Sequence, residues 1–171
     1  WGTAFGRSNS GLLKNVGLGI FFYLASVPVV IFYSILNALA LKYFEIPVES
    51  QDVIRMMLDS SQPFWTQAGF VLLAVLVAPV VEEFFFRGIA LSVAVKHVRP
   101  MLAVLAVSFI FSAMHFNIGA IVPLFIFAFT LSLAYLYSGS IVVPIVMHAL
   151  FNGANTCLIF IFRDMLLLPG N

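Results

Sequence analysis

Six polar side chains lie within stretches of the sequence that are otherwise apolar: Glu82, Glu83, Arg87, His115, His148 and Asn152. A charged side chain at the centre of a membrane-spanning helix costs ~2.5 to 3.5 kcal/mol on insertion scales, so such residues normally face the interior of a helix bundle and act there. A single histidine would be explained as well by a structural hydrogen bond. Because three separate apolar stretches each carry members of this set, we interpret it as a functional site.

Helical spacing assigns partners to these residues. Glu83 and Arg87 are four residues apart, so they share one side of a helix and are expected to form an ion pair. Glu82 is rotated by ~100° from Glu83, which leaves its carboxylate without the arginine and available as a general base. His148 and Asn152 are also four apart and offer neighbouring hydrogen-bond donors.

These groups suit the hydrolysis of an acyl bond. Glu82 can hold a water molecule with His115 as a second base, and the donors at His148 and Asn152 can stabilise the oxyanion of a tetrahedral intermediate. Alternatively, Glu82, His115 and His148 could bind a zinc ion whose fourth position holds water. We favour catalysis without a cofactor, because three protein ligands would leave no free carboxylate to take the proton of the water. A zinc-bound water can ionise near neutral pH unaided, so the metal-dependent alternative stays open.

The composition indicates a membrane protein. Of the 171 residues, 63% are hydrophobic and 9% are charged, and the mean hydropathy is +1.11, unlike a soluble domain. The net charge of +1 provides no basic surface for nucleic acid. Because a bilayer core of ~30 Å requires about 20 apolar residues per helix, we predict an all-α transmembrane bundle of about five spanning helices, the third of them short. The predicted helices are Val16 to Leu41, Phe64 to about Val95, Met101 to about Phe116, Ile118 to Tyr137 and Ile141 to Phe162.

The connections complete this arrangement. Lys42 to Pro63 is a polar surface loop, in which we expect a short interfacial helix capped by Ser50. Lys96 to Arg99 form a basic turn that should face the cytoplasm. We expect residues 1–171 to form a single membrane domain, with the motif-bearing core at about residues 64–162.

Distance along the helices gives the depth of the candidate residues. Glu82 and His115 both lie ~21 Å from the basic turn if their helices are straight, so they can meet. His148 is only ~12 Å from the turn at Ser138 to Ser140. It joins them only if that turn is recessed into the membrane.

The order of the motifs resembles that of a known family. Glu82 to Arg87 reads E-E-x-x-x-R, Phe111 to His115 reads F-x-x-x-H, and His148 to Asn152 reads H-x-x-x-N. In this order on successive apolar segments, they are similar to the signature of the CPBP intramembrane proteases. That family includes CAAX-type prenyl endopeptidases and bacteriocin-processing or self-immunity proteins. The resemblance covers roughly Pro79 to Asn155.

The resemblance implies an endopeptidase that hydrolyses a peptide bond near the membrane surface, from a water-filled cavity in the bundle. Glu82 would activate the water with His115, His148 and Asn152 would stabilise the oxyanion, and the ion pair of Glu83 would order its helix. The implied substrate is a peptide or membrane protein, prenylated or not. We expect a multi-pass protein of the bacterial cytoplasmic membrane.

Two other functions stay open. A proton-coupled transporter could use the same residues as a proton relay, but it needs a continuous polar path to both membrane faces, and the first and fourth segments offer few polar groups for one. A non-catalytic membrane scaffold could retain the same helices. The completeness of the motifs argues against the scaffold.

Overall fold

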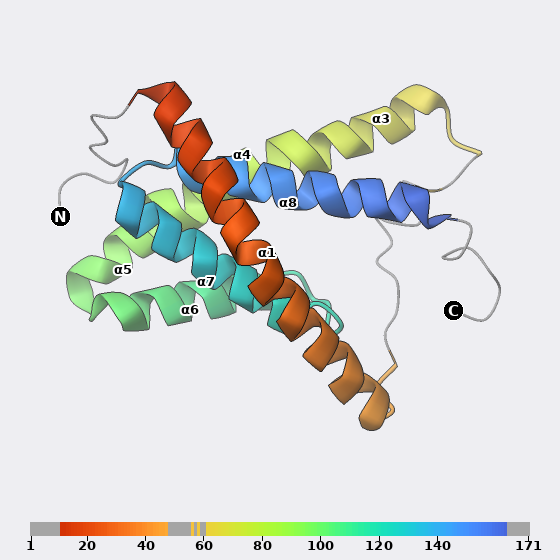
Figure 1. Ribbon diagram of the computed structural model, residues 1–171, viewed down its shortest axis with the longest axis horizontal. Coiled ribbons are helices and arrows are strands. Elements are labelled where there is room, and N and C mark those ends of the chain that lie inside the picture. Colours follow the sequence, from red (N-terminus) through yellow and green to blue (C-terminus); the bar gives the residue numbers. More distant parts are fainter. Residues whose placement is uncertain (1–10, 48–55, 57, 59–60, 164–171) are drawn as a thin grey trace.

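The protein is built of helices connected by short turns. The computed structural model describes residues 11–47, 56, 58 and 61–163, and no strand occurs among them. The helices are α1 (Leu12–Tyr43), α3 (Phe64–Leu72), η1 (Leu73–Val77), α4 (Ala78–Glu83), η2 (Phe84–Leu91), α5 (Ser92–His97), α6 (Pro100–Ala113), α7 (Ile121–Ser138) and α8 (Val142–Ile161) (Figure 1). The predicted all-α bundle is confirmed.

Four helical stretches in the described part of the chain have the length and hydropathy of membrane spans. Three are α1, α7 and α8, and the fourth is the 34-residue helix Phe64–His97, which consists of α3 to α5. With 14 residues, α6 is shorter than a full span requires, in agreement with the short third segment. The chain is therefore an integral, multi-pass membrane protein.

The α-helical winding of the helix Phe64–His97 is interrupted by two π-helical segments. Its segments η1 and η2 are π-helical and flank α4 on both sides. A π-helical turn is wider than an α-helical turn and frequently occurs at functional sites. The two adjacent glutamates at the end of α4 thus lie directly before one such segment.

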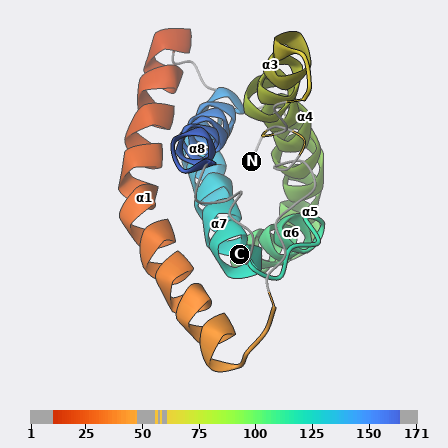
Figure 2. The ribbon, with the colours of Figure 1, turned by 90° about the vertical axis from the view of Figure 1, so that its right-hand side faces the viewer.

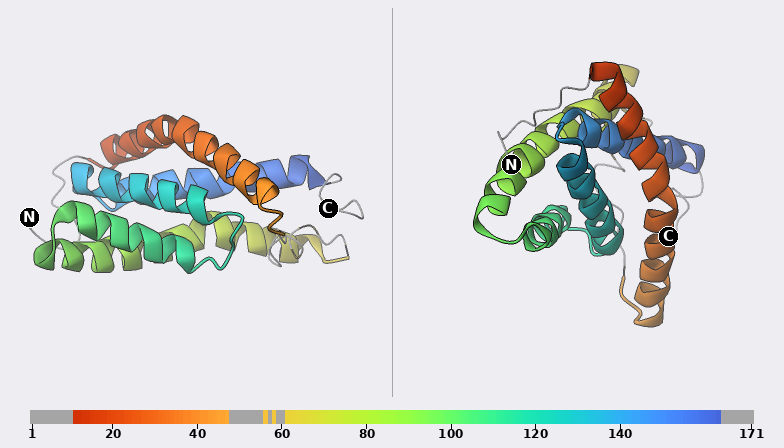
Figure 3. Two further views of the ribbon diagram at one scale, coloured as in Figure 1. Left: turned by 90° about the horizontal axis from the view of Figure 1, so that it is seen from below. Right: turned by 60° about the vertical axis from the view of Figure 1, so that its left-hand side comes forward.

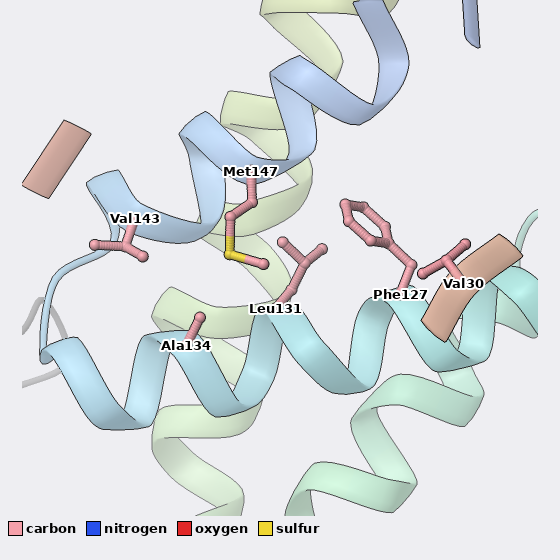
Figure 4. Close-up of a cluster of buried hydrophobic side chains, with 6 residues drawn as sticks. All are labelled: Val30, Phe127, Leu131, Ala134, Val143 and Met147. Carbon is pink, nitrogen blue, oxygen red and sulfur yellow. The ribbon is translucent and has the colours of Figure 1, made fainter. Parts of the chain in front are cut away.

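The first helix crosses α7 and α8 on one side of the bundle (Figures 1 and 2). A Cβ atom at Gly19 would lie 2.7 Å from Cβ of Val146, so the absence of a side chain at Gly19 permits the close approach of α1 to α8. A cluster of buried apolar side chains joins these three helices (Figure 4): Val30, Phe127, Leu131, Ala134, Val143 and Met147. This cluster holds the part of α8 that carries His148.

A second apolar cluster lies on the other side of α7. It joins η2, α6 and α7 and consists of Leu91, Ala103, Val104, Val107 and Tyr135. Figure 3 (left) shows the resulting order, with α1 over α7 and α8, and these over α6 and the interrupted helix. The two clusters therefore bring the candidate residues of α4, η2 and α8 together inside the bundle, with His115 in the turn after α6.

Three predicted helix boundaries differ from the observed ones by three or four residues, and one prediction falls outside the described residues. Helix α1 begins at Leu12 and not at Val16, and α7 begins at Ile121 and not at Ile118. Helix α6 was expected to continue to about Phe116, but it ends at Ala113. Phe116 has a φ of 49°, in the left-handed region, and an α-helix cannot continue through that conformation. The predicted interfacial helix falls mainly on residues 48–55, 57 and 59–60, which are not described; Leu58 within this stretch is buried.

Candidate active site

Glu83 is the centre of a buried polar cluster. It is the last residue of α4, and its side chain is fully buried. Its Oε1 atom accepts hydrogen bonds from Nη1 of Arg87 at 2.7 Å and from Nδ1 of His148 at 2.8 Å. The ion pair expected from helical spacing is therefore present, and the same carboxylate also holds a histidine of α8.

Arg87 connects this cluster to two further helices. Its buried guanidinium donates from Nη2 to the carbonyl oxygen of Ala128 in α7 at 2.9 Å. It also lies over the ring of Phe111 in α6, with Cζ 5.0 Å from the ring centroid. A buried charge requires an opposite charge and hydrogen-bond acceptors, and Glu83 and Ala128 supply both. One arginine thus links three parts of the bundle.

The backbone of η2 is fixed at the same residue. The hydroxyl of Ser92, directly after η2, donates to the carbonyl oxygen of Arg87 at 2.9 Å and lies 3.0 Å from the hydroxyl of Tyr135. Tyr135 is seven residues after Ala128, so both lie on one face of α7. Helix α7 therefore holds the side chain of Arg87 directly, through Ala128, and the main chain of Arg87 indirectly, through Tyr135 and Ser92.

Glu82 faces His148 across a short gap. Its Oε2 atom lies 3.9 Å from Nε2 of His148, which is too long for a direct hydrogen bond. The Glu82 side chain is 31% exposed, yet its Oε2 atom is buried and receives no hydrogen bond from any residue that the structure describes. Oε2 of Glu83 is also buried without a hydrogen bond among the described residues. The two adjacent glutamates differ in that Oε1 of Glu83 is fixed by Arg87 and His148, whereas Glu82 has no such ion pair within hydrogen-bond distance.

His148 lies beside both glutamates and so belongs to the same cluster. Its ring makes edge-to-face contacts with two phenylalanine rings, with centroids 5.7 Å from Phe111 and 5.8 Å from Phe127. Because Nδ1 is held by Glu83, Nε2 is directed toward Glu82. The hydrogen bond to Glu83 and the two edge-to-face aromatic contacts therefore determine the orientation of the imidazole.

His115 lies in the turn that follows α6. Its Nδ1 is 2.8 Å from the carbonyl oxygen of Phe111. A carbonyl only accepts, so Nδ1 is the donor and Nε2 carries the lone pair of the neutral ring. The His115 ring centroid is 4.8 Å from that of Phe111, which also contacts His148. Both histidines thus contact the ring of Phe111. Among the described residues, His115 makes no ion pair with Glu82.

Asn152 connects α8 to the first π-helical segment. Its Nδ2 donates to the carbonyl oxygen of Ala74 at 2.8 Å. The N–H of Ala78 donates to Leu73, and Pro79 has no N–H, so the helix itself leaves the Ala74 carbonyl without its usual donor. The amide of Asn152 replaces that donor and keeps a second N–H for another acceptor.

The described residues include no group of three or more His, Cys, Asp or Glu side chains that could hold a metal ion. Glu82 and His148 face each other, and Glu83 binds the other nitrogen of His148, as carboxylates do for metal-bound histidines. His115, the third ligand of the zinc alternative, does not complete this pair. Catalysis without a metal ion stays a prediction, which the activity in the presence of a metal chelator tests.

The sequence did not indicate three contacts of this site. Two are the backbone carbonyls of Ala74 and Ala128, which accept hydrogen bonds from Asn152 and Arg87. Every residue carries a carbonyl, so residue type gives no signal for such partners. The third is Phe127 beside His148, and it is one of 19 phenylalanines. Its place at the site depends on how α7 packs against α8.

Comparison with known families identifies the region that contains the candidate site. Residues 64–154, more than half of the chain, match the family model described as Type II CAAX prenyl endopeptidase Rce1-like. No curated protein and no solved structure matches the chain. The matched residues run from the start of α3 into α8 and include all six candidate residues, whereas α1 precedes them. This match supports a protease and confirms the resemblance to the CPBP proteases: the chain belongs to the Rce1-like family of type II CAAX prenyl endopeptidases.

Proposed function

We propose that the protein is an intramembrane endopeptidase that uses a water molecule activated by Glu82 and His115. The observation that carries this proposal is the 3.9 Å gap between Oε2 of Glu82 and Nε2 of His148. The gap is bounded by a carboxylate oxygen without a hydrogen-bond donor among the described residues and by an imidazole whose orientation is fixed.

The 3.9 Å separation matches the span of a bridging water. Because Oε2 of Glu82 is buried, the partly exposed Glu82 side chain must shift to admit that water. Hydrogen bonds of ~2.8 Å to both atoms would meet at the water oxygen at an angle of about 90°. Such a water would lie beside a carboxylate able to take its proton. A carboxylate in this position acts as a general base, which contributes typically ~10² to 10⁴-fold to a rate.

The two histidines are suited to different roles. Nε2 of His115 carries the lone pair when Nδ1 donates to Phe111, so His115 can accept a hydrogen bond from the water. Nδ1 of His148 is held by Glu83, and Nε2 faces the gap toward Glu82, where it can donate a hydrogen bond when it carries the proton. The Nε2–H of His148 and the second N–H of Asn152 can then bind the oxyanion.

The reaction follows from these positions. The water oxygen forms a bond to the carbonyl carbon of the peptide while Glu82 takes a proton, and the π electrons of the carbonyl move onto its oxygen. His148 and Asn152 stabilise that oxyanion. When the carbonyl re-forms, the carbon–nitrogen bond breaks and Glu82 returns the proton to the leaving amine. No metal ion takes part in this proposal.

The test compares three substrates and two glutamate variants. Purified protein in lipid vesicles is incubated with a prenylated peptide, the same peptide without the prenyl group, and a transmembrane peptide, and the products are identified by mass spectrometry. We expect cleavage of at least one of them, most readily the prenylated one, and loss of cleavage in Glu82→Gln. Glu45→Gln is the matched control, because Glu45 is exposed after α1 and far from the site in the chain. Full activity of Glu82→Gln would refute the mechanism.

A further inference from the structure

The second half of α1 has little contact with the rest of the bundle. The buried residues of this helix are Asn15, Gly19, Ser26 and Val30. Beyond Val30 its large apolar side chains are exposed, among them Ile35, Leu36 and Leu39. Figure 1 shows this orange end of α1 extending past the other helices.

One polar side chain of this half nevertheless reaches another segment. Nδ2 of Asn37 donates to the carbonyl oxygen of Gly119 at 2.8 Å, across 82 positions of the chain. Ser26 and Ser34 instead bond to carbonyls of α1 itself, at Tyr23 and Val30. An amide in an apolar environment costs several kcal/mol without a partner, so Asn37 fixes where α1 meets the turn that contains Gly119.

That turn joins α6 to α7 and contains His115. It is held within itself by hydrogen bonds from Phe116 N–H to Ala113 and from Ala120 N–H to Asn117. Phe116 has a left-handed φ of 49° and is 94% exposed, so its side chain adds almost no packing. The bond from Asn37 is therefore a tertiary restraint on a turn whose other recorded hydrogen bonds are local.

We propose that Asn37 is a positioning residue for His115. By holding Gly119, it fixes the turn and hence the distance of the His115 ring from the reacting water. This inference rests on the proposed role of His115. It implies that α1, which lies outside the residues that match the family, completes the geometry of the site.

The test uses Asn37→Leu with Ser34→Ala as the matched control. Both remove a polar group from the same face of α1, one turn apart, but the Ser34 hydroxyl bonds only within its own helix in the contact that the structure records. We expect Asn37→Leu to lower kcat about 10-fold with KM nearly unchanged, because small displacements of a catalytic group are costly. Asn37→Gln retains the amide and should recover part of that loss.

A second measurement does not depend on activity. Hydrogen–deuterium exchange of residues 114–120 should be faster in Asn37→Leu and unchanged in Ser34→Ala. Unchanged exchange in Asn37→Leu would overturn the restraint, and faster exchange with an unchanged kcat would overturn the positioning role. A fall in kcat that Asn37→Gln shares fully, together with global unfolding by circular dichroism, would also overturn it. If the wild-type protein cleaves no peptide, the proposed function fails and the catalytic role of Asn37 fails with it, while exchange still decides whether Asn37 holds the turn.

Discussion

The buried pair of Glu83 and Arg87 can be tested by a double-mutant cycle. The variants are Glu83→Gln, Arg87→Met and both together. Glutamine and methionine keep roughly the size of the side chains they replace, so the cycle measures the loss of charge more than the loss of volume. Each single variant leaves one fully buried charge without its partner in the ion pair.

The structure sets the expected magnitudes. Glu83→Gln removes the counter-charge of Arg87, at a cost of ~3 to 5 kcal/mol in the free energy of unfolding. Arg87→Met leaves Glu83 with the hydrogen bond from His148, so we expect the lower end of that range, plus about 1 kcal/mol for the lost bond to Ala128. Independent effects would add to more than about 6 kcal/mol. Since the double variant buries neither charge of the pair, it should be at least ~3 kcal/mol more stable than that sum.

The free energies are measured by reversible unfolding in mixed micelles of mild detergent and dodecyl sulfate, followed by circular dichroism. Ser34→Ala, measured in the same micelles, is the control. We expect it to change the free energy of unfolding far less than any of the charge variants, because its hydroxyl bonds within α1. Additive costs of the two single variants would refute the reasoning. They would mean that Glu83 and Arg87 are solvated separately and that their 2.7 Å contact does not couple them.

Three further predictions concern the oxyanion donor, the topology and the metal. Asn152→Leu should lower kcat about 100-fold, as expected for the loss of one oxyanion donor. Adding Pro79→Ala to this variant returns a backbone N–H to the helix and should restore stability without restoring kcat. Recovery of kcat in the double variant would contradict the assignment of Asn152 as an oxyanion donor. One candidate span, Phe64–His97, lies between Glu45 and His97. In a variant that lacks the native cysteine, cysteines placed at these two positions should therefore react with an impermeant thiol reagent from opposite membrane faces. Reaction from the same face would contradict this number of spans. Activity should survive a metal chelator, whereas its loss and restoration by zinc, with one zinc per chain by elemental analysis, would make His115 and His148 ligands.

Hydropathy and helical spacing predict the parts of this molecule that depend on one segment at a time. The apolar segments follow from the length a bilayer requires, and the pair of Glu83 with Arg87 follows from a separation of four residues in one helix. The position of His148 depends on how α8 packs against its neighbours, including the close approach at Gly19. No local pattern contains that information, so the sequence left its depth open.

The end of α6 and the bond of Asn152 were unpredictable for a related reason. The left-handed residue after α6 is a phenylalanine, Phe116, and not the glycine that usually signals such a conformation. The hydrogen bond from Asn152 to Ala74 depends on a proline, on a π-helical segment and on the packing of α8 against that segment. The proline is visible in the sequence, but the altered winding is not.

The two π-helical segments also determine where this helix can change in length. A turn closed between residues five apart holds one residue more than an α-helical turn. Deleting one residue from η2 would let it wind as an α-helix, and because the wider turn already contains the extra residue, α5 would keep nearly its present rotation relative to α4 and Leu91 would stay in its cluster with α6 and α7. A deletion within η1 would likewise leave α3 near its present rotation and Glu82 and Glu83 in register with α8. A deletion within α5 would instead rotate the residues that follow by ~100°. In natural relatives, single-residue gaps should therefore be tolerated within η1 and η2 and selected against in the α-helical segments.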